Sequence, residues 1–60
     1  MIYEHVKELA DKKNMTIKEI EKRAGLANGA IGKWDSSMPR IDNLQAVAKV
    51  LETPIDYFLQ

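Results

Sequence analysis

The segment that most constrains the fold is residues 16–34, with the sequence TIKEIEKRAGLANGAIGKW. Apolar residues recur at helical spacing on both sides of Gly25, so the pattern predicts two short helices joined by a tight turn at that glycine. The residues expected to point into the core are Ile17, Ile20, Ala24, Leu26, Ala30, Ile31 and Trp34. The turn is short enough to fold the second helix across the first, so the other elements must pack around that pair.

The first of these two helices has clear boundary signals. Thr16 followed by Glu19 predicts a capping box, in which the two residues satisfy two backbone amides at the start of the helix. Met15 and Ile20 occupy the positions of the accompanying hydrophobic staple. Gly25 is expected to end the helix, because a left-handed backbone is favourable there mainly for glycine.

The second helix is poorly specified by its local sequence. Gly29 and Gly32 each cost about 1 kcal/mol relative to alanine inside a helix. Ala27, at the expected start, has no side-chain oxygen to cap the first amides. We therefore expect the packing of Ile31 and Trp34 to hold this segment helical.

Three further helices are predicted, and no segment has the alternating pattern of a strand. The residues around Pro39 should form a loop. Asp42 is the expected N-cap of the next helix, and Thr53 followed by Pro54 is expected to cap and start the last one. The predicted helices cover residues 2–13, 17–24, 28–35, 42–52 and the segment from 54 onward. The fold class is therefore all-α, a compact bundle of five short helices.

Length and composition narrow the possible classes. Sixty residues are enough for one small domain over 1–60, and the absence of cysteine excludes disulfides and thiolate metal sites. No apolar run approaches the roughly 20 residues of a membrane span and no targeting peptide is evident, so a cytoplasmic location is expected. The net charge is zero, with about +2 on residues 1–33 and −2 on residues 34–60. Nucleic-acid-binding domains usually carry a basic surface, and this chain has only a small excess of basic residues in its first half. Charge alone therefore neither indicates nor excludes DNA binding.

Three stretches of the sequence, in this order and spacing, are similar to those of a known family: VKELADKKNMTIKEIEKRAGL, then NGAIGKWD, then PRIDNLQAVAKVLETPIDYFL. Together they make the chain similar to the lambda-repressor-like family, the Cro/Xre type of helix-turn-helix. The resemblance implies a bacterial or phage transcriptional regulator, most often a repressor. It also implies a homodimer on a palindromic double-stranded DNA operator, with helix 28–35 in the major groove.

The resemblance assigns roles to nine residues. Those matching base-facing positions of the recognition helix are Asn28, Gly29, Gly32 and Lys33. Those matching phosphate-contacting positions are Thr16, Lys18, Ser36, Ser37 and Arg40. Dimerisation would come from residues 57–60 or from a further C-terminal domain absent from this chain.

Three departures from the family pattern affect this segment, and one of them is glycine at two of the four groove-facing positions. Ala27 replaces the usual capping serine or threonine, and Glu21 replaces a small alanine where the two helices approach. We expect Glu21 to turn outward, or to pair with Lys18 or another cation. Asn28 either bridges N6 and N7 of an adenine or substitutes for the missing cap.

The other groove-facing residues also have two interpretations each. Lys33 donates to guanine or to phosphate, or it stays solvated. Gly29 and Gly32 let the backbone sit deeper in the groove, or they are not selected for contact, or they pack closely on another protein. If they admit the backbone, DNA shape must supply much of the specificity.

One rival function remains from the sequence. A helix-turn-helix fold of the antirepressor or antitoxin type would present the same segment to a protein, and the zero net charge and the two glycines favour this alternative. An enzyme is not expected, because no nucleophile–base pair or carboxylate pair is assembled by the helical pattern. No cofactor is implied.

Overall fold

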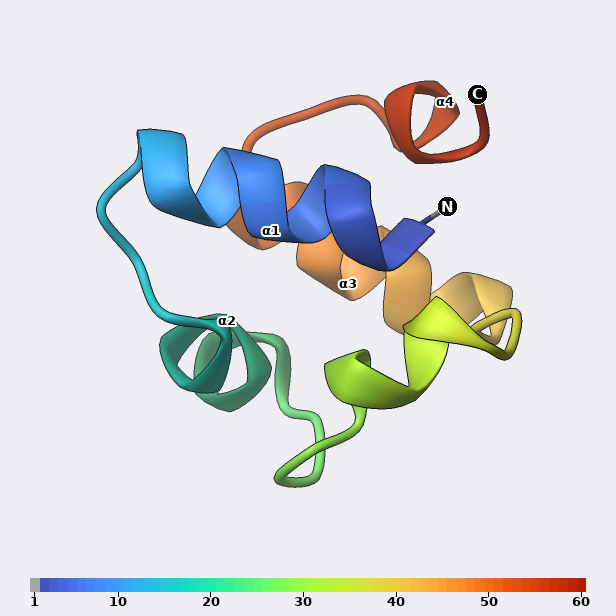
Figure 1. Cartoon of the computed structure of the whole chain (residues 1–60), viewed down its shortest axis with the longest axis horizontal. Coiled ribbons are helices and arrows are strands. Elements are labelled where there is room, and N and C mark those ends of the chain that lie inside the picture. Colours follow the sequence, from blue (N-terminus) through green and yellow to red (C-terminus); the bar gives the residue numbers. More distant parts are fainter. Residues whose placement is uncertain (1) are drawn as a thin grey trace.

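The computed structural model describes residues 2–60, which form four α-helices and one 3-10 helix (Figure 1). The elements are α1 (Ile2–Lys12), α2 (Ile17–Ala24), the 3-10 helix η1 (Ile31–Asp35), α3 (Ile41–Val50) and α4 (Ile55–Phe58). Helix α1 packs against η1, α2 and α4, whereas α3 packs against α2 and α4. The all-α class is confirmed, but the five predicted α-helices are four.

Every element contributes to one apolar core. The fully buried large side chains are Phe58, Ile20, Ile31, Leu44, Leu51, Val6 and Val47. Of the residues predicted to face inward in segment 16–34, Ile20, Ile31 and Trp34 are buried, and the others are half-buried. In the last turn Phe58 is fully buried, whereas Leu59 is 50% exposed.

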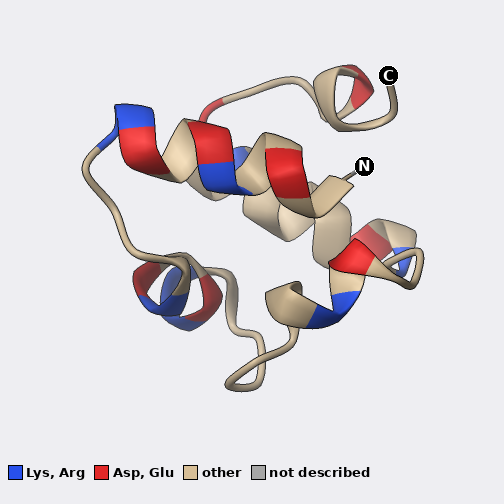
Figure 2. Cartoon of the chain, in the orientation of Figure 1, with Lys and Arg blue, Asp and Glu red and all other residues tan. Residues whose placement is uncertain are grey.

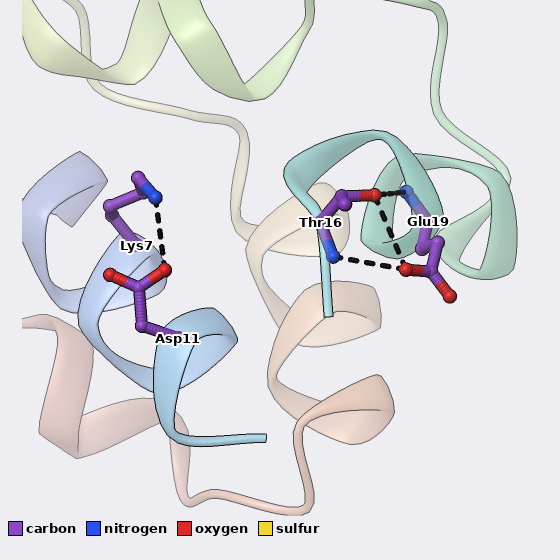
Figure 3. Close-up of polar contacts among 4 residues, drawn as sticks. All are labelled: Lys7, Asp11, Thr16 and Glu19. Atoms are coloured by element: carbon purple, nitrogen blue, oxygen red, sulfur yellow. Dashed lines mark hydrogen bonds and ion pairs between the residues drawn. The ribbon is translucent and has the colours of Figure 1, made fainter. Parts of the chain in front are cut away.

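The predicted capping box at the start of α2 is confirmed (Figure 3). Glu19 N–H donates to Thr16 Oγ1 at 3.1 Å, and Thr16 N–H donates to Glu19 Oε1 at 3.1 Å. Figure 3 also shows Lys7 Nζ donating to Asp11 Oδ1 at 2.9 Å on α1, a bond that raises the pKa of Lys7. Both of these side chains are exposed, so the pair contributes little stability.

Helices α1, α2 and α3 end in the same way. A residue with left-handed backbone follows each helix: Asn14 at φ 56°, Gly25 at φ 76° and Glu52 at φ 53°. After α2, Leu26 N–H donates to Glu21 O at 2.8 Å and Gly25 N–H to Lys22 O at 3.3 Å, which is the Schellman pair. Equivalent bonds close α1 and α3, and the predicted role of Gly25 is confirmed.

Three predicted helix starts are wrong. The segment predicted as a helix over 28–35 is a turn followed by η1, because Gly29 has a φ of 84° and interrupts helical geometry. Asp42 lies inside the first turn of α3, with Arg40 at the N-cap. Thr53 does not cap α4: its hydroxyl donates to Leu51 O at 2.9 Å, and Pro54 occupies the N-cap.

Glu52 should be a site of strain that glycine relieves. A non-glycine residue in left-handed backbone costs about 1–2 kcal/mol, although glycine returns part of this by gaining entropy in the unfolded chain. We expect Glu52→Gly to raise the free energy of unfolding by about 0.5–1 kcal/mol, a rise of a few degrees in Tm by thermal denaturation.

The control is Glu52→Ala, which removes a carboxylate from the negative end of α3 but keeps the strained Cβ. The glycine variant should be more stable than the alanine variant. Equal Tm values for the two would contradict the prediction, because they would show that the strain relieved at position 52 does not exceed the entropy that glycine gains in the unfolded chain.

Candidate nucleic-acid interface

The segment between α2 and η1 contains no charged side chain. Figure 2 shows acidic and basic residues interleaved along α1 and α2, while this turn carries neither colour. Asn28 and Gly29 are exposed within it, and Ala30 N–H closes a bond of 3.1 Å to Ala27 O. The turn is therefore held by backbone geometry and by its neighbours rather than by ion pairs of its own.

Glu21 is the neighbour that fixes this turn. Its side chain is only 3% exposed, and it is the one polar or charged residue of the described chain that is buried. Oε1 accepts Gly29 N–H at 3.1 Å, and Oε2 accepts Ile31 N–H at 3.0 Å. The expectation that Glu21 turns outward or pairs with Lys18 is wrong. It instead supplies the acceptors that the missing cap at Ala27 cannot.

Sequence reasoning noticed Glu21 as a departure but missed its role. A carboxylate on the inner face of one helix lacks hydrogen-bond donors, and the start of the next helix lacks an acceptor for its amides. These two features together could have predicted that Glu21 binds those amides. The cap role left open for Asn28 is filled by Glu21, which leaves the exposed Asn28 side chain available for other contacts.

The 3-10 geometry of η1 follows from its two anchors. A 3-10 helix has three residues per turn, so residues three apart lie on the same side. Ile31 and Trp34 have this spacing and are both buried, at 0% and 6% exposure, as α1 packs over η1. Gly32 and Lys33 between them are exposed. The prediction that Trp34 belongs to the core is confirmed.

Four of the nine predicted contact residues surround one open depression. Its volume is about 290 Å³, and Trp34 contributes to its lining. The polar residues around it are Asn28, Lys33, Ser37, Arg40 and Asn43. Asn43, half-buried on α3, was not predicted from the sequence. The depression therefore joins the turn, η1, the following loop and the start of α3 into one surface, which we call the η1 face.

The other five predicted residues are exposed but do not line this depression. Gly29 lies in the turn, Gly32 lies in η1, and Ser36 is the C-cap of η1. Thr16 and Lys18 lie at the start of α2, where the Thr16 hydroxyl is already engaged with Glu19. A phosphate contact from Thr16 would have to share atoms with the capping box.

Arg40 has an acidic partner. Its Nε lies 3.3 Å from Asp42 Oδ1, and its Nη2 donates to Asp42 Oδ2 at 3.4 Å. The side chains are 81% and 62% exposed, so solvent screens the pair and it contributes little to stability. The positive charge at this edge of the η1 face is consequently partly neutralised before any ligand binds.

Three further observations concern the His5 ring, metal sites and membrane spans. His5 lies on α1 and packs its ring 5.0 Å from that of Tyr57 on α4, between centroids. Within residues 2–60, no group of three or more metal-ligating side chains is assembled. Over the same residues, no helix has the length and apolar character needed to cross a bilayer.

Comparison with known families agrees with this architecture. A family model described as Helix-turn-helix matches residues 6–58, which is nearly the whole chain. A search of curated proteins and a search of solved structures each gave no significant match. The matched region contains α2, the turn and η1 in the order of the bipartite motif, and it confirms the resemblance to the lambda-repressor-like family. The chain therefore belongs to the Cro/C1-type helix-turn-helix family of DNA-binding domains.

Proposed function

We propose that this protein is a sequence-specific regulator of transcription, a bacterial or phage repressor that binds a palindromic operator. The observation that carries the proposal is the η1 face. It gathers an amide, an amine, a hydroxyl and a guanidinium around one open depression next to the exposed side of η1. These are the groups that contact base edges and phosphates in the major groove.

Each group has a role in this proposal. Asn28 reads adenine through its amide, and Lys33 donates to guanine O6 or N7 or to a phosphate. Ser36, Ser37 and Arg40 contact phosphates from the loop, and Thr16 and Lys18 do so from the start of α2. Phosphate contacts fix the register and carry no sequence information, so direct readout rests on two side chains.

Size supports a dimer on DNA. The longest extent of the Cα trace is 23 Å, whereas successive major grooves on one side of a duplex are about 34 Å apart. One copy therefore covers one half-site, and two copies are needed for a palindrome. We propose residues 57–60 as the contact between copies, since Leu59 is half exposed there.

The rival function is a protein-interaction module of the antirepressor or antitoxin type. The zero net charge and the partial neutralisation of Arg40 by Asp42 favour it. In either case we propose a cytoplasmic protein that works by binding, with no catalysis and no cofactor.

Two substitutions on the η1 face test DNA binding directly. Lys33→Ala and Arg40→Ala should each weaken binding in gel-shift titrations against the DNA upstream of the protein's own gene. The logarithm of affinity should fall with log salt by about 0.9 per phosphate neutralised, and each variant that loses a phosphate contact should flatten that slope by about this amount.

Lys49→Ala is the matched control, because Lys49 is an exposed lysine on α3 outside the η1 face. If neither η1-face variant differs from it, the assigned DNA surface is wrong. An affinity for DNA that does not respond to salt would favour the protein-interaction module.

Releasing Arg40 should strengthen binding. Asp42→Asn removes the carboxylate that competes with phosphate, so we expect affinity for any duplex to rise about 2- to 5-fold, in keeping with the modest energy of an exposed pair. The salt slope should also steepen. Asp56→Asn on α4 removes the same charge away from Arg40 and should give a smaller gain.

The double variant Arg40→Ala/Asp42→Asn distinguishes the mechanism. It should lose the gain seen for Asp42→Asn alone. If the gain persists without Arg40, it comes from net charge and not from the released guanidinium.

A substitution at Gly32 tests the effect on stability and the effect on DNA binding separately. It has no positive φ, and an added Cβ would meet nothing within 4 Å, so Gly32→Ala should stabilise the fold by about 0.4–1 kcal/mol. If the bare backbone sits against the bases, the same change should weaken operator binding. Thermal denaturation and titration on one sample measure both effects.

Gly29→Ala provides the contrast, because its φ of 84° makes any side chain strained and the variant should lose stability. An alanine at position 32 that stabilises the protein and leaves operator affinity unchanged would refute the close approach of the helix to the groove.

A further inference from the structure

We infer that Glu21 is a positioning residue for the proposed DNA-reading segment, because its buried carboxylate fixes the turn that presents Asn28. The inference rests on the proposed function. It adds that specificity depends on a residue that is itself hidden from DNA, with a side chain only 3% exposed.

The geometry uses both carboxylate oxygens. Oε1 holds Gly29 N–H at 3.1 Å and Oε2 holds Ile31 N–H at 3.0 Å. The backbone carbonyl of the same residue accepts Leu26 N–H at 2.8 Å. Three amides of the connection between α2 and η1 are thus fastened to one residue of α2.

The two side-chain bonds lie between the proposed reading residues in the sequence. Asn28 immediately precedes the held amide of Gly29, and Lys33 lies two residues after the held amide of Ile31. Gly29 also has a left-handed φ of 84°, and a Cβ added there would meet no atom within 4 Å. Without the carboxylate, the bond from Ala30 N–H to Ala27 O would be the hydrogen bond left across Asn28 and Gly29.

Neither glutamine nor aspartate at position 21 would reproduce both hydrogen bonds. Glutamine offers one acceptor oxygen and one NH2 group, so it would set a donor against one of the two backbone donors. Aspartate has two oxygens and the charge but is one methylene shorter. Among the described residues no lysine or arginine forms an ion pair with Glu21, so the two amide donors are its compensation.

Charge and position have opposite effects on DNA binding, which makes the inference testable. Removing a negative charge by itself should raise affinity for every duplex. Misplacing Asn28 should lower affinity only for the cognate duplex. The probes are a duplex selected from a randomised pool by the wild-type protein and an unrelated duplex of equal length.

We expect folded Glu21→Gln to bind the selected duplex at least tenfold more weakly, while the unrelated duplex is bound equally or better. Asn28→Ala should add little loss on the Glu21→Gln background. Leu51→Val is the control, because Leu51 is fully buried after α3 and does not line the η1 face. It should lower Tm without changing the ratio of the two affinities.

The inference is overturned if folded Glu21→Gln keeps its affinity ratio within twofold of wild type, or if Asn28→Ala costs as much on both backgrounds. Should the glutamine variant be unfolded, Glu21→Asp is measured in its place with the same expectations. If neither variant folds, Glu21 is needed for folding itself and the positioning role is refuted.

A second readout does not require DNA. In ¹⁵N-labelled protein, at least one of the amide protons of Gly29 and Ile31 should exchange faster in Glu21→Gln than in Leu51→Val. If the wild type selects no duplex but this difference is found, the proposed function fails while the fixed turn stands. If the difference is not found, the inference fails regardless of DNA binding.

Discussion

The pair of hydrogen bonds from Gly29 and Ile31 to the buried Glu21 carboxylate is the constraint on which the η1 face depends. Hydrogen bonds to an ionised acceptor are stronger than neutral ones, and a buried donor that loses its acceptor bears the full desolvation penalty. The connection after α2 therefore has one favourable arrangement. Ile31 can be buried and its amide satisfied only in that arrangement, and Trp34 follows it into the core one 3-10 turn later.

The parts of the fold that the sequence predicts correctly are those decided within a few residues. Thr16 and Glu19 are three positions apart, and Gly25 ends α2 through bonds to Glu21 and Lys22. The turn that replaces the predicted start of the next helix is held by a carboxylate ten residues upstream of Ile31, which the residues of the turn itself do not reveal. Asp42 and Thr53 are good caps by residue type but do not cap, because other bonds engage their side chains: Asp42 pairs with Arg40, and the Thr53 hydroxyl donates to Leu51 O.

Prediction of the candidate site has the same limit. Helical spacing and the family resemblance identify nine contact residues, and all nine are exposed. They do not reveal which of these surround a common depression, because that requires the path of the loop between η1 and α3. They also do not reveal that Arg40 is held by Asp42, since a pair two residues apart at a helix start depends on side-chain conformation.

The separation between anchors and exposed residues has a consequence for how such a protein changes over time. Glu21, Ile31 and Trp34 hold the turn and η1 from the inside, while the side chains of Asn28 and Lys33 form no hydrogen bond or ion pair within the described residues. Mutations at the two exposed positions are therefore not penalised by folding. A helix-turn-helix domain built in this way can exchange the side chains on its exposed surface while its fold stays the same, so related domains can diverge without passing through unfolded intermediates.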